Sequence, residues 1–320
     1  MRQARTTPRR TALLRTALLA VAGLLAVGAC AGPPNPVPGV PSDVRPAVID
    51  RDLTYAAPDD QPLTLDAYLP RRTGEPVPAV VLVHGGAFVG GAKDTAGMVT
   101  IARRLQDHGI AAFTVTYRLA PEHTYPAPVD DVAAAVAWLR DPAQQAAYGV
   151  DPERVGVLGT SAGATLALTL GTRPAAETGV RAVVALSAAT LLTADGLTFG
   201  PTSADETRAA LAYLGCAEVD ECPVGEQASP ALTVTPASSP ALLVTGTVES
   251  IPLPHAERMV QALTDAGVDH DLVAVEGDAH GAHLLDEAVW TRVLDFLDTR
   301  LAAPEPAAAE SAAPEAGAAG

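Results

Sequence analysis

The sequence predicts an α/β domain with a mostly parallel central sheet that helices cover on both faces. Two observations indicate this class. Short runs of Val, Ala and Leu without polar alternation are typical of strands buried on both faces. Longer amphipathic runs separate them, as the connections between parallel strands require. The chain has 320 residues, enough for one large domain or two small ones, and we favour one.

The predicted elements follow one another between residues 49 and 301. Two β-type runs, residues 53–56 and 63–69, are expected to form an opening hairpin. The run at residues 79–83 is apolar throughout and predicts a buried strand. Further strands are predicted at residues 110–117, 155–158, 182–186, 241–245 and 271–275. Helices are predicted at residues 95–106, 129–138, 162–170, 255–266 and 286–300. The one long stretch between strands, residues 188–240, is the candidate lid over a site.

The N-terminal segment, residues 1–29, predicts export. Five arginines precede an uncharged run that is too short to span a bilayer, which is typical of a secretory signal. Its ending, Val27-Gly28-Ala29-Cys30, resembles the lipobox at which bacterial lipoproteins are cleaved and lipidated on the cysteine. We therefore expect an extracytoplasmic protein anchored in the cell membrane through Cys30, with a plain signal peptide and secretion as the alternative. Arg9-Arg10 leaves a twin-arginine signal open as well.

Two further segments are expected to lie outside the packed domain. Residues 30–48 are rich in proline and lack a periodic apolar pattern, so they predict an extended tether between anchor and domain. Residues 302–320 consist mainly of Ala, Pro, Glu, Gly and Ser, which is too poor in large apolar groups to join a core. We expect this segment to be a disordered tail.

The net charge bears on the kind of partner that the protein binds, and the cysteine content bears on whether it contains a disulfide. The formal net charge is −16 at pH 7, and cleavage before Cys30 would remove five arginines and no acidic residue. Such an acidic chain argues against a nucleic-acid partner. With Cys30 lipidated, Cys216 and Cys222 remain, and an exported protein meets an oxidising compartment. We expect them to form a disulfide, with two buried free thiols as the alternative.

The pentapeptide Gly159-Thr160-Ser161-Ala162-Gly163 is the first candidate for chemistry. It lies between a predicted strand and a predicted helix, which is the context of a nucleophilic serine on a strained turn. Close packing of strand on helix leaves no space for side chains two residues either side of the serine, and glycines occupy both positions. Ser161 is therefore the candidate nucleophile.

A second glycine motif directly follows the predicted strand at residues 79–83. Adjacent glycines let backbone N–H groups turn toward a substrate oxygen without obstruction by a Cβ atom. We expect Gly85, Gly86 and Ala162 to supply the N–H groups of an oxyanion hole. Phe88, the last residue of the motif, is a candidate substrate-binding residue.

A general base and an orienting acid should follow Ser161 in the chain. His280, in the loop after the last strand, is the candidate base. His283 lies in the same loop and is the alternative base; otherwise it is expected to be solvated or to cap the following helix. Glu249 is the only carboxylate of the loop at residues 246–252, after the strand at residues 241–245, and is the candidate acid. Asp278 is the substitute acid. The remaining histidines are interpreted as surface or structural residues, with His84 shaping its own loop; these are His84, His108, His123, His255 and His270.

Three motifs together carry a family resemblance. HGGAF, then YRLAPEHTYPAPVDD up to Asp131, then DPERVGVLGTSAG up to Gly163 resemble the hormone-sensitive-lipase-like esterases of the α/β-hydrolase superfamily and similar exported carboxylesterases. The resemblance covers about residues 53–301. It implies the α/β-hydrolase fold, the site roles given above and a structural role for Asp131.

The sequence departs from the family pattern at two places. The family acid is usually aspartate, where this chain has Glu249. The N-terminal cap of many lipase-like members is missing, because the opening hairpin and first buried strand occupy residues 49–79. A less covered site with Phe88 nearby favours short acyl esters.

Taken with the resemblance, the motifs predict a serine carboxylester hydrolase that acts on a small-molecule ester through an acyl-enzyme. No metal or organic cofactor is expected, because no histidine–carboxylate cluster has ligand spacing. The alternatives are an amide or peptide-type serine hydrolase and a noncatalytic envelope-binding lipoprotein. The oligomeric state stays open.

Overall fold

The computed structural model describes residues 47–71, 74–199 and 203–303. The predicted signal segment, the lipidation site Cys30 and nearly all of the predicted tether and tail lie outside these residues. The described residues that follow Ser42 belong to one compact unit, and only this unit is described below.

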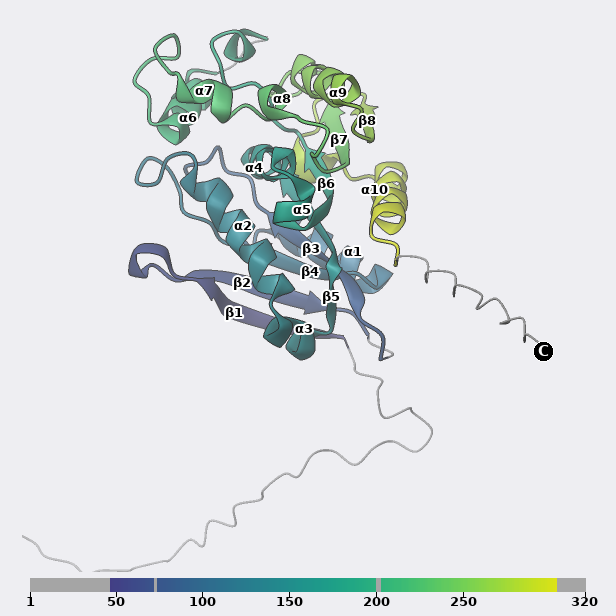
Figure 1. Ribbon diagram of the computed structural model, residues 1–320. Coiled ribbons are helices and arrows are strands. Elements are labelled where there is room, and N and C mark those ends of the chain that lie inside the picture. Colours follow the sequence, from purple (N-terminus) through teal and green to yellow (C-terminus); the bar gives the residue numbers. More distant parts are fainter. Residues whose placement is uncertain (1–46, 72–73, 200–202, 304–320) are drawn as a thin grey trace, which may run out of the picture. The chain divides into compact units, whose positions relative to one another are not determined.

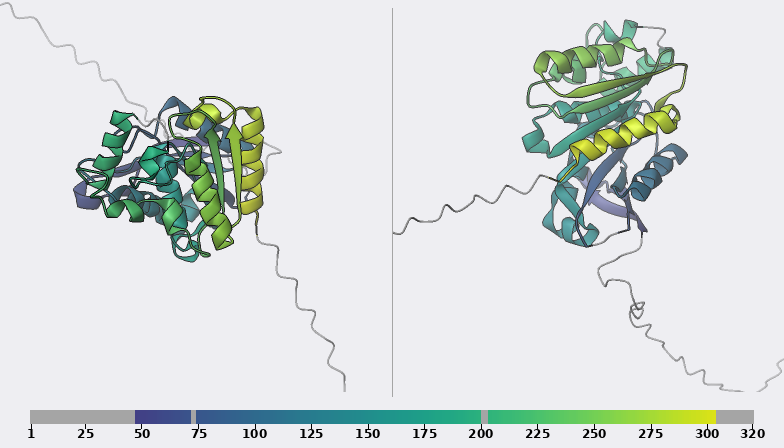
Figure 2. Two further views of the ribbon diagram at one scale, coloured as in Figure 1. Left: turned by 90° about the horizontal axis from the view of Figure 1, so that it is seen from above. Right: turned by 90° about the vertical axis from the view of Figure 1, so that its right-hand side faces the viewer.

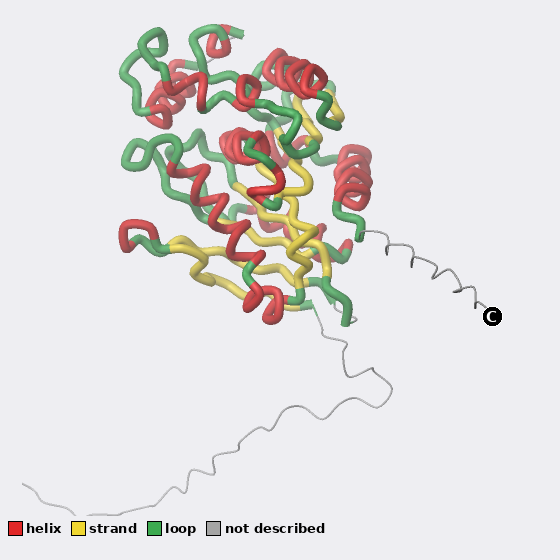
Figure 3. Tube along the Cα trace, viewed as in Figure 1, coloured by secondary structure: helices red, strands yellow, loops and turns green. Residues whose placement is uncertain are grey.

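The centre of the domain is an eight-stranded sheet (Figures 1 and 3). Its strands are β1 (Val48–Ala56), β2 (Leu63–Leu69), β3 (Val77–Val83), β4 (Ala111–Val115), β5 (Val150–Thr160), β6 (Val180–Leu186), β7 (Ala241–Gly246) and β8 (His270–Val275). They lie in the order β1-β2-β4-β3-β5-β6-β7-β8. β2 pairs antiparallel with β1 and β4, and every other pair is parallel. The predicted fold class is therefore confirmed.

Helices cover both faces of the sheet (Figure 2). α1 (Ala96–His108) and α10 (Glu287–Arg300) share one apolar cluster with the sheet, which contains Ile101, Leu105 and Leu297. α2 (Ala127–Arg140), α4 (Ala162–Thr172) and α9 (Pro254–Ala266) belong to the cluster on the other face. Within the strands, successive residues such as Val80 and Val81 belong to opposite clusters. This explains why the strands are apolar without alternation.

The element boundaries differ from the predictions for local reasons. Thr95 and Asp286, predicted as first helical residues, are N-caps whose side chains accept the N–H groups of Met98 and Val289. β5 begins at Val150, earlier than predicted, because Val150 pairs with Val77. The sequence pattern does not predict the short elements α3, α5, η1 and η3, which span Pro142–Tyr148, Ala175–Thr178, Pro58–Asp60 and Gly281–Leu284.

Asp131 has the structural position that the resemblance implies. It is buried, and its carboxylate accepts the backbone N–H of Arg118 at 2.8 Å and three contacts from the Arg118 guanidinium. Arg118 also pairs with Asp59, in the turn between β1 and β2. The pair thus fixes the YRLAPE segment to α2 and to the hairpin.

Residues 188–240, here called the lid segment, connect β6 to β7. Their described part contains η2 (Gly196–Thr198), α6 (Ala204–Leu214), α7 (Val224–Gln227) and α8 (Pro230–Thr233). A disulfide joins Cys216 to Cys222 directly after α6, so the predicted pairing is confirmed. Tyr213 of α6 stacks on Phe88, with 4.1 Å between ring centroids. The lid segment is therefore packed on the loop that follows β3.

Candidate active site

Ser161 occupies a sharp turn between β5 and α4. Its φ of 54° and ψ of −124° are strained values for a residue with a side chain. A Cβ atom on Gly159 would lie 2.1 Å from the Gly163 carbonyl oxygen, and one on Gly163 would lie 2.2 Å from that of Val83. Glycine is thus required at both flanking positions, for the packing reason that the sequence suggested.

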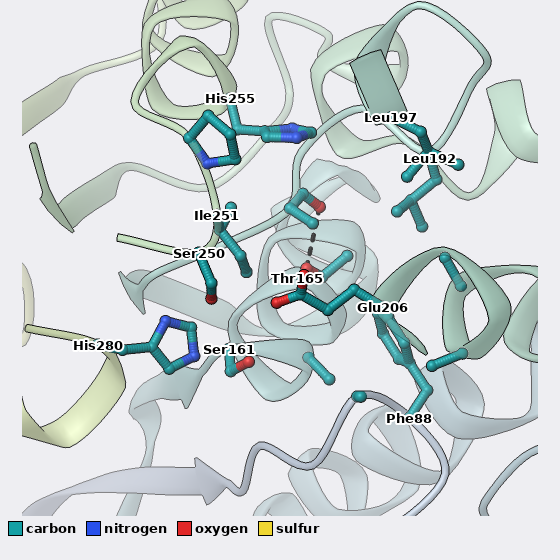
Figure 4. Close-up of a pocket in the computed structure, with 16 residues that line it drawn as sticks. Phe88, Ser161, Thr165, Leu192, Leu197, Glu206, Ser250, Ile251, His255 and His280 are labelled. Carbon is teal, nitrogen blue, oxygen red and sulfur yellow. Dashed lines mark hydrogen bonds between the residues drawn. The ribbon is translucent and has the colours of Figure 1, made fainter. Parts of the chain in front are cut away.

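His280 lies beside Ser161 in the same pocket (Figure 4). It is the N-cap residue of η3, in the loop that follows β8. Its Nδ1 is hydrogen-bonded to Oε2 of Glu249. The other ring nitrogen, Nε2, is consequently the one available to a proton on Ser161.

Glu249 is held in a buried network. Its Oε1 accepts hydrogen bonds from the Gly246 N–H at 2.7 Å, the Thr245 hydroxyl at 2.8 Å and the Ser187 hydroxyl at 2.9 Å. Burial alone would raise the pKa of this carboxyl, but the hydrogen bonds from His280, Gly246, Thr245 and Ser187 together lower it below its usual value. The Glu249 side chain is therefore kept as a carboxylate beside the imidazole.

The alternative residues lie elsewhere. Asp278 and His283 are both exposed, and neither side chain has a described contact with the His280 ring. Asp286, rather than His283, caps α10. The structure thus brings together Ser161, His280 and Glu249, in spite of the extra methylene that distinguishes glutamate from aspartate.

The predicted oxyanion residues lie around the elbow. Ala162 is the first residue of α4, so its N–H has no acceptor within the helix, and it lines the pocket beside Ser161. A Cβ atom on Gly85 would lie 3.0 Å from the Ser161 Cβ atom. Gly86 has a φ of 130°, and a Cβ atom there would lie 2.2 Å from the Gly90 carbonyl oxygen.

The HGGAF loop is shaped by His84. Its Nδ1 lies 2.8 Å from the Gly85 carbonyl oxygen, and its ring stacks on Tyr117 with 4.3 Å between centroids. Burial lowers the pKa of His84, so the ring is neutral and structural. Beyond the glycines, Ala87 and Phe88 form the wall of the pocket itself.

The pocket is small and mostly apolar. Its volume is about 110 Å³, below the usual range of ligand sites. The lid segment contributes six lining residues: Ala189, Leu192, Leu197, Glu206, Ala209 and Ala210. The loop after β7 and the start of α9 add Ser250, Ile251, Pro252 and His255.

His255 is a structural histidine rather than a surface one, and it lies closer to the site than the sequence suggests. It is 4% exposed, and its Nδ1 accepts the backbone N–H groups of Thr190 at 3.2 Å and Leu191 at 3.4 Å. Burial lowers its pKa to about 4. His255 is therefore a neutral histidine that joins α9 to the lid segment and faces the pocket. Nothing in its sequence neighbourhood signals this, because the contact spans 64 residues or more.

Residues 47–71, 74–199 and 203–303 contain neither a metal cluster nor a membrane-spanning helix. No group of three or more His, Cys, Asp and Glu side chains in these ranges is arranged to hold a metal ion. No helix in the same ranges has the length and apolar character needed to cross a membrane.

Comparisons with known proteins place the chain in a family. A family model described as BD-FAE matches residues 65–263, more than half of the chain. Over 117 residues the chain is 38% identical to carboxylesterase NlhH of Mycobacterium tuberculosis, covering 37% of this chain and 35% of that protein. Over 124 residues it is 33% identical to arylacetamide deacetylase of Oryctolagus cuniculus, covering 38% of this chain and 31% of that protein. The chain thus spans about a third of the length of these relatives.

Solved structures agree on the fold. An esterase from the archaeon Pyrobaculum calidifontis superimposes with a TM-score of 0.66 at 27% identity, covering 81% of this chain and 86% of that one. A carbohydrate esterase from gut microbiota superimposes with a TM-score of 0.68 at 20% identity, covering 79% and 96%. The family model over residues 65–263, with the strand–turn–helix elbow at Ser161 and the shared fold, shows that the chain belongs to the BD-FAE family of the α/β-hydrolase superfamily.

Proposed function

We propose that the protein is a serine carboxylester hydrolase. The observation that carries the proposal is the shared pocket of Ser161 and His280, with His280 tied through Nδ1 to the buried Glu249 carboxylate. Nucleophile, base and orienting acid in this relation are the parts that acyl transfer requires. The names of the relatives, carboxylesterase NlhH and the Pyrobaculum esterase, support the same class.

The proposed reaction begins at the Ser161 hydroxyl. His280 accepts its proton while Oγ attacks the ester carbonyl carbon, and Glu249 stabilises the imidazolium that forms. The Ala162 N–H, with the N–H groups of Gly85 and Gly86, stabilises the charge that develops on the carbonyl oxygen. His280 then protonates the leaving alcohol, and a water molecule repeats the steps on the acyl-enzyme.

Short acyl esters are the proposed substrates. The pocket is about 110 Å³ and bounded by the lid segment, Phe88 and Ile251, which suits a small acyl or alcohol group better than a long chain. The stack of Phe88 on Tyr213 supports a fixed wall at this side.

The test is a chain-length series with the serine variant as control. Initial rates of the wild type and Ser161→Ala are measured on 4-nitrophenyl acetate, butyrate and decanoate. We expect serine-dependent hydrolysis that falls from butyrate to decanoate. Equal rates for both proteins would refute the ester-hydrolase proposal, and a preference for decanoate would refute the short-chain part alone.

An amide hydrolase is the second candidate, because one relative is named arylacetamide deacetylase. Matched 4-nitrophenyl butyrate and 4-nitrobutyranilide separate the two. Higher kcat/KM on the anilide would favour the amide reaction.

A further inference from the structure

Glu206 extends from α6 of the lid segment into the pocket (Figure 4). Its Oε2 accepts the Ser203 N–H at 2.8 Å, and the Ser203 hydroxyl accepts the Glu206 N–H at 3.1 Å. This capping box begins α6. It occupies Oε2, and among the described residues Oε1 has no hydrogen-bond donor.

The other polar side chains of the pocket are neutral or already engaged. Thr165 donates to the Ala189 carbonyl oxygen at 2.9 Å. The buried His255 ring accepts two backbone N–H groups on Nδ1 and is uncharged. Ser161 and His280 are assigned to the reaction, and Ser250 carries a neutral hydroxyl. Among the described lining residues, Glu206 is the one carboxylate, and none is lysine or arginine.

A carboxylate on an otherwise apolar wall discriminates between ligands by charge. It attracts hydroxyl and ammonium groups, and it repels a second carboxylate. The formal net charge of −16 acts in the same direction at long range. No lysine or arginine among the described lining residues cancels either effect.

We propose that Glu206 is a specificity-determining residue, which favours esters that carry a hydroxyl or ammonium group and disfavours esters that carry a carboxylate. This inference rests on the proposed ester hydrolysis. It adds the class of substituent that the pocket accepts, and it assigns that choice to the lid segment rather than to the residues around Ser161.

A purely structural role for Glu206 can be separated from this one. Glutamine completes a capping box as glutamate does, so Glu206→Gln removes the charge and keeps the cap. Its melting temperature should match the wild type. Glu226→Gln is the matched control, because Glu226 is an exposed glutamate of α7 that does not line the pocket.

The experiment measures kcat/KM by titration of released acid on paired esters. Butyrylcholine is compared with its uncharged isostere 3,3-dimethylbutyl butyrate, glycerol 1-butyrate with propyl butyrate, and monoethyl succinate with ethyl pentanoate. The readout is the ratio of kcat/KM within each pair, so a change common to both substrates cancels.

We expect Glu206→Gln to raise the succinate ratio by about tenfold and to lower the choline or glycerol ratio several-fold. A fall in the kcat/KM ratio of the choline pair alone would show selection of a cation. A fall in the ratio of the glycerol pair would show selection of hydroxyl groups. Glu226→Gln should keep the wild-type ratios.

Two results would count against the inference in different ways. Ratios that are equal in the wild type and Glu206→Gln, with active enzyme, would overturn the role of Glu206 and leave the ester hydrolase in place. A wild type that hydrolyses none of the uncharged esters would overturn the proposed function, and this inference with it.

Discussion

The Ser187 hydroxyl donates a hydrogen bond to Oε1 of Glu249 at 2.9 Å and accepts the Gly281 N–H at 2.8 Å. Ser187 is fully buried and follows the last residue of β6. It therefore links the loop of the proposed acid to the residue after His280, through one side-chain oxygen. The position of the acid relative to the base depends on this strand end as well as on their own loops.

Removal of the Ser187 hydroxyl should impair turnover more than substrate binding. Ser187→Ala leaves a buried carboxylate oxygen and a backbone N–H each with one partner fewer, which costs about 1–3 kcal/mol. We expect kcat to fall by about tenfold or more with a smaller change in KM, measured on 4-nitrophenyl butyrate. Ser239→Ala is the control, because Ser239 is also buried and donates to a backbone oxygen, of Val180, away from the site. Equal kinetic losses in both variants would contradict a positioning role for Ser187.

The Glu249 carboxylate should be essential as the acceptor of the His280 Nδ1–H, and the length of the side chain that carries it should matter less. Glu249→Gln puts a neutral amide beside His280 and should lower kcat by orders of magnitude. Glu249→Asp keeps the charge and should retain more activity. Steady-state kinetics of both variants at equal pH test this order. If neither change affects the rate, the acid lies elsewhere, and Asp278→Asn should then be the damaging variant.

The buried His255 should make the fold sensitive to mild acid. Burial lowers its pKa to about 4 from the ordinary value of 6.5, so below pH 6.5 the unfolded chain takes up a proton that the folded chain does not. The free energy of unfolding should consequently fall as the pH drops from 6.5 to 4, by about 3 kcal/mol at most. Urea unfolding of the wild type and His255→Asn across this range tests the prediction. A wild-type curve parallel to that of the variant would show that His255 does not contribute.

Loss of the Cys216–Cys222 disulfide should weaken the lid segment only slightly. The two residues are 6 apart in sequence, and a short ring removes little chain entropy, about 2–3 kcal/mol at most. The double Cys→Ser variant should show a modest fall in melting temperature by calorimetry and a larger KM, because α6 supplies pocket residues. Reduction of the wild type should reproduce both changes, and an unaltered KM would separate the disulfide from the pocket.

Cys30 is proposed as the lipid anchor. Cys30→Ser should release the protein from the membrane fraction into the soluble extracytoplasmic fraction, as followed by immunoblot after ultracentrifugation. Metabolic labelling with a fatty-acid analogue should mark the wild type and not the variant. Persistent membrane association of Cys30→Ser would point to another anchor.

The order of strands and helices can be predicted from the sequence because it depends on local composition. Apolar runs without alternation indicate strands buried on both faces, and the clusters that contain Val80 and Val81 show why. The short helices of the lid segment cannot be predicted in this way, since they are stabilised by contacts such as the Tyr213–Phe88 stack rather than by a periodic pattern. The start of β5 is equally hidden, because it depends on pairing with β3.

Ser161 and its two flanking glycines can also be identified from the sequence, since the strand–turn–helix elbow spans five residues and has no space for a side chain at either flanking position. Cys216 and Cys222 can be paired for a different reason, because they are the two cysteines that remain when Cys30 is assigned to the lipid anchor. The other residues that line the pocket cannot be identified from the sequence in this way. Glu206 and His255 reach it from elements that are far from Ser161 along the chain, and a glutamate in a helix cap or a histidine at a helix start is common in proteins without any pocket nearby. Tertiary packing decided between Glu249 and Asp278 as the carboxylate that contacts His280, and it placed Glu206 in the pocket, because both depend on where separate strand ends and the lid segment meet.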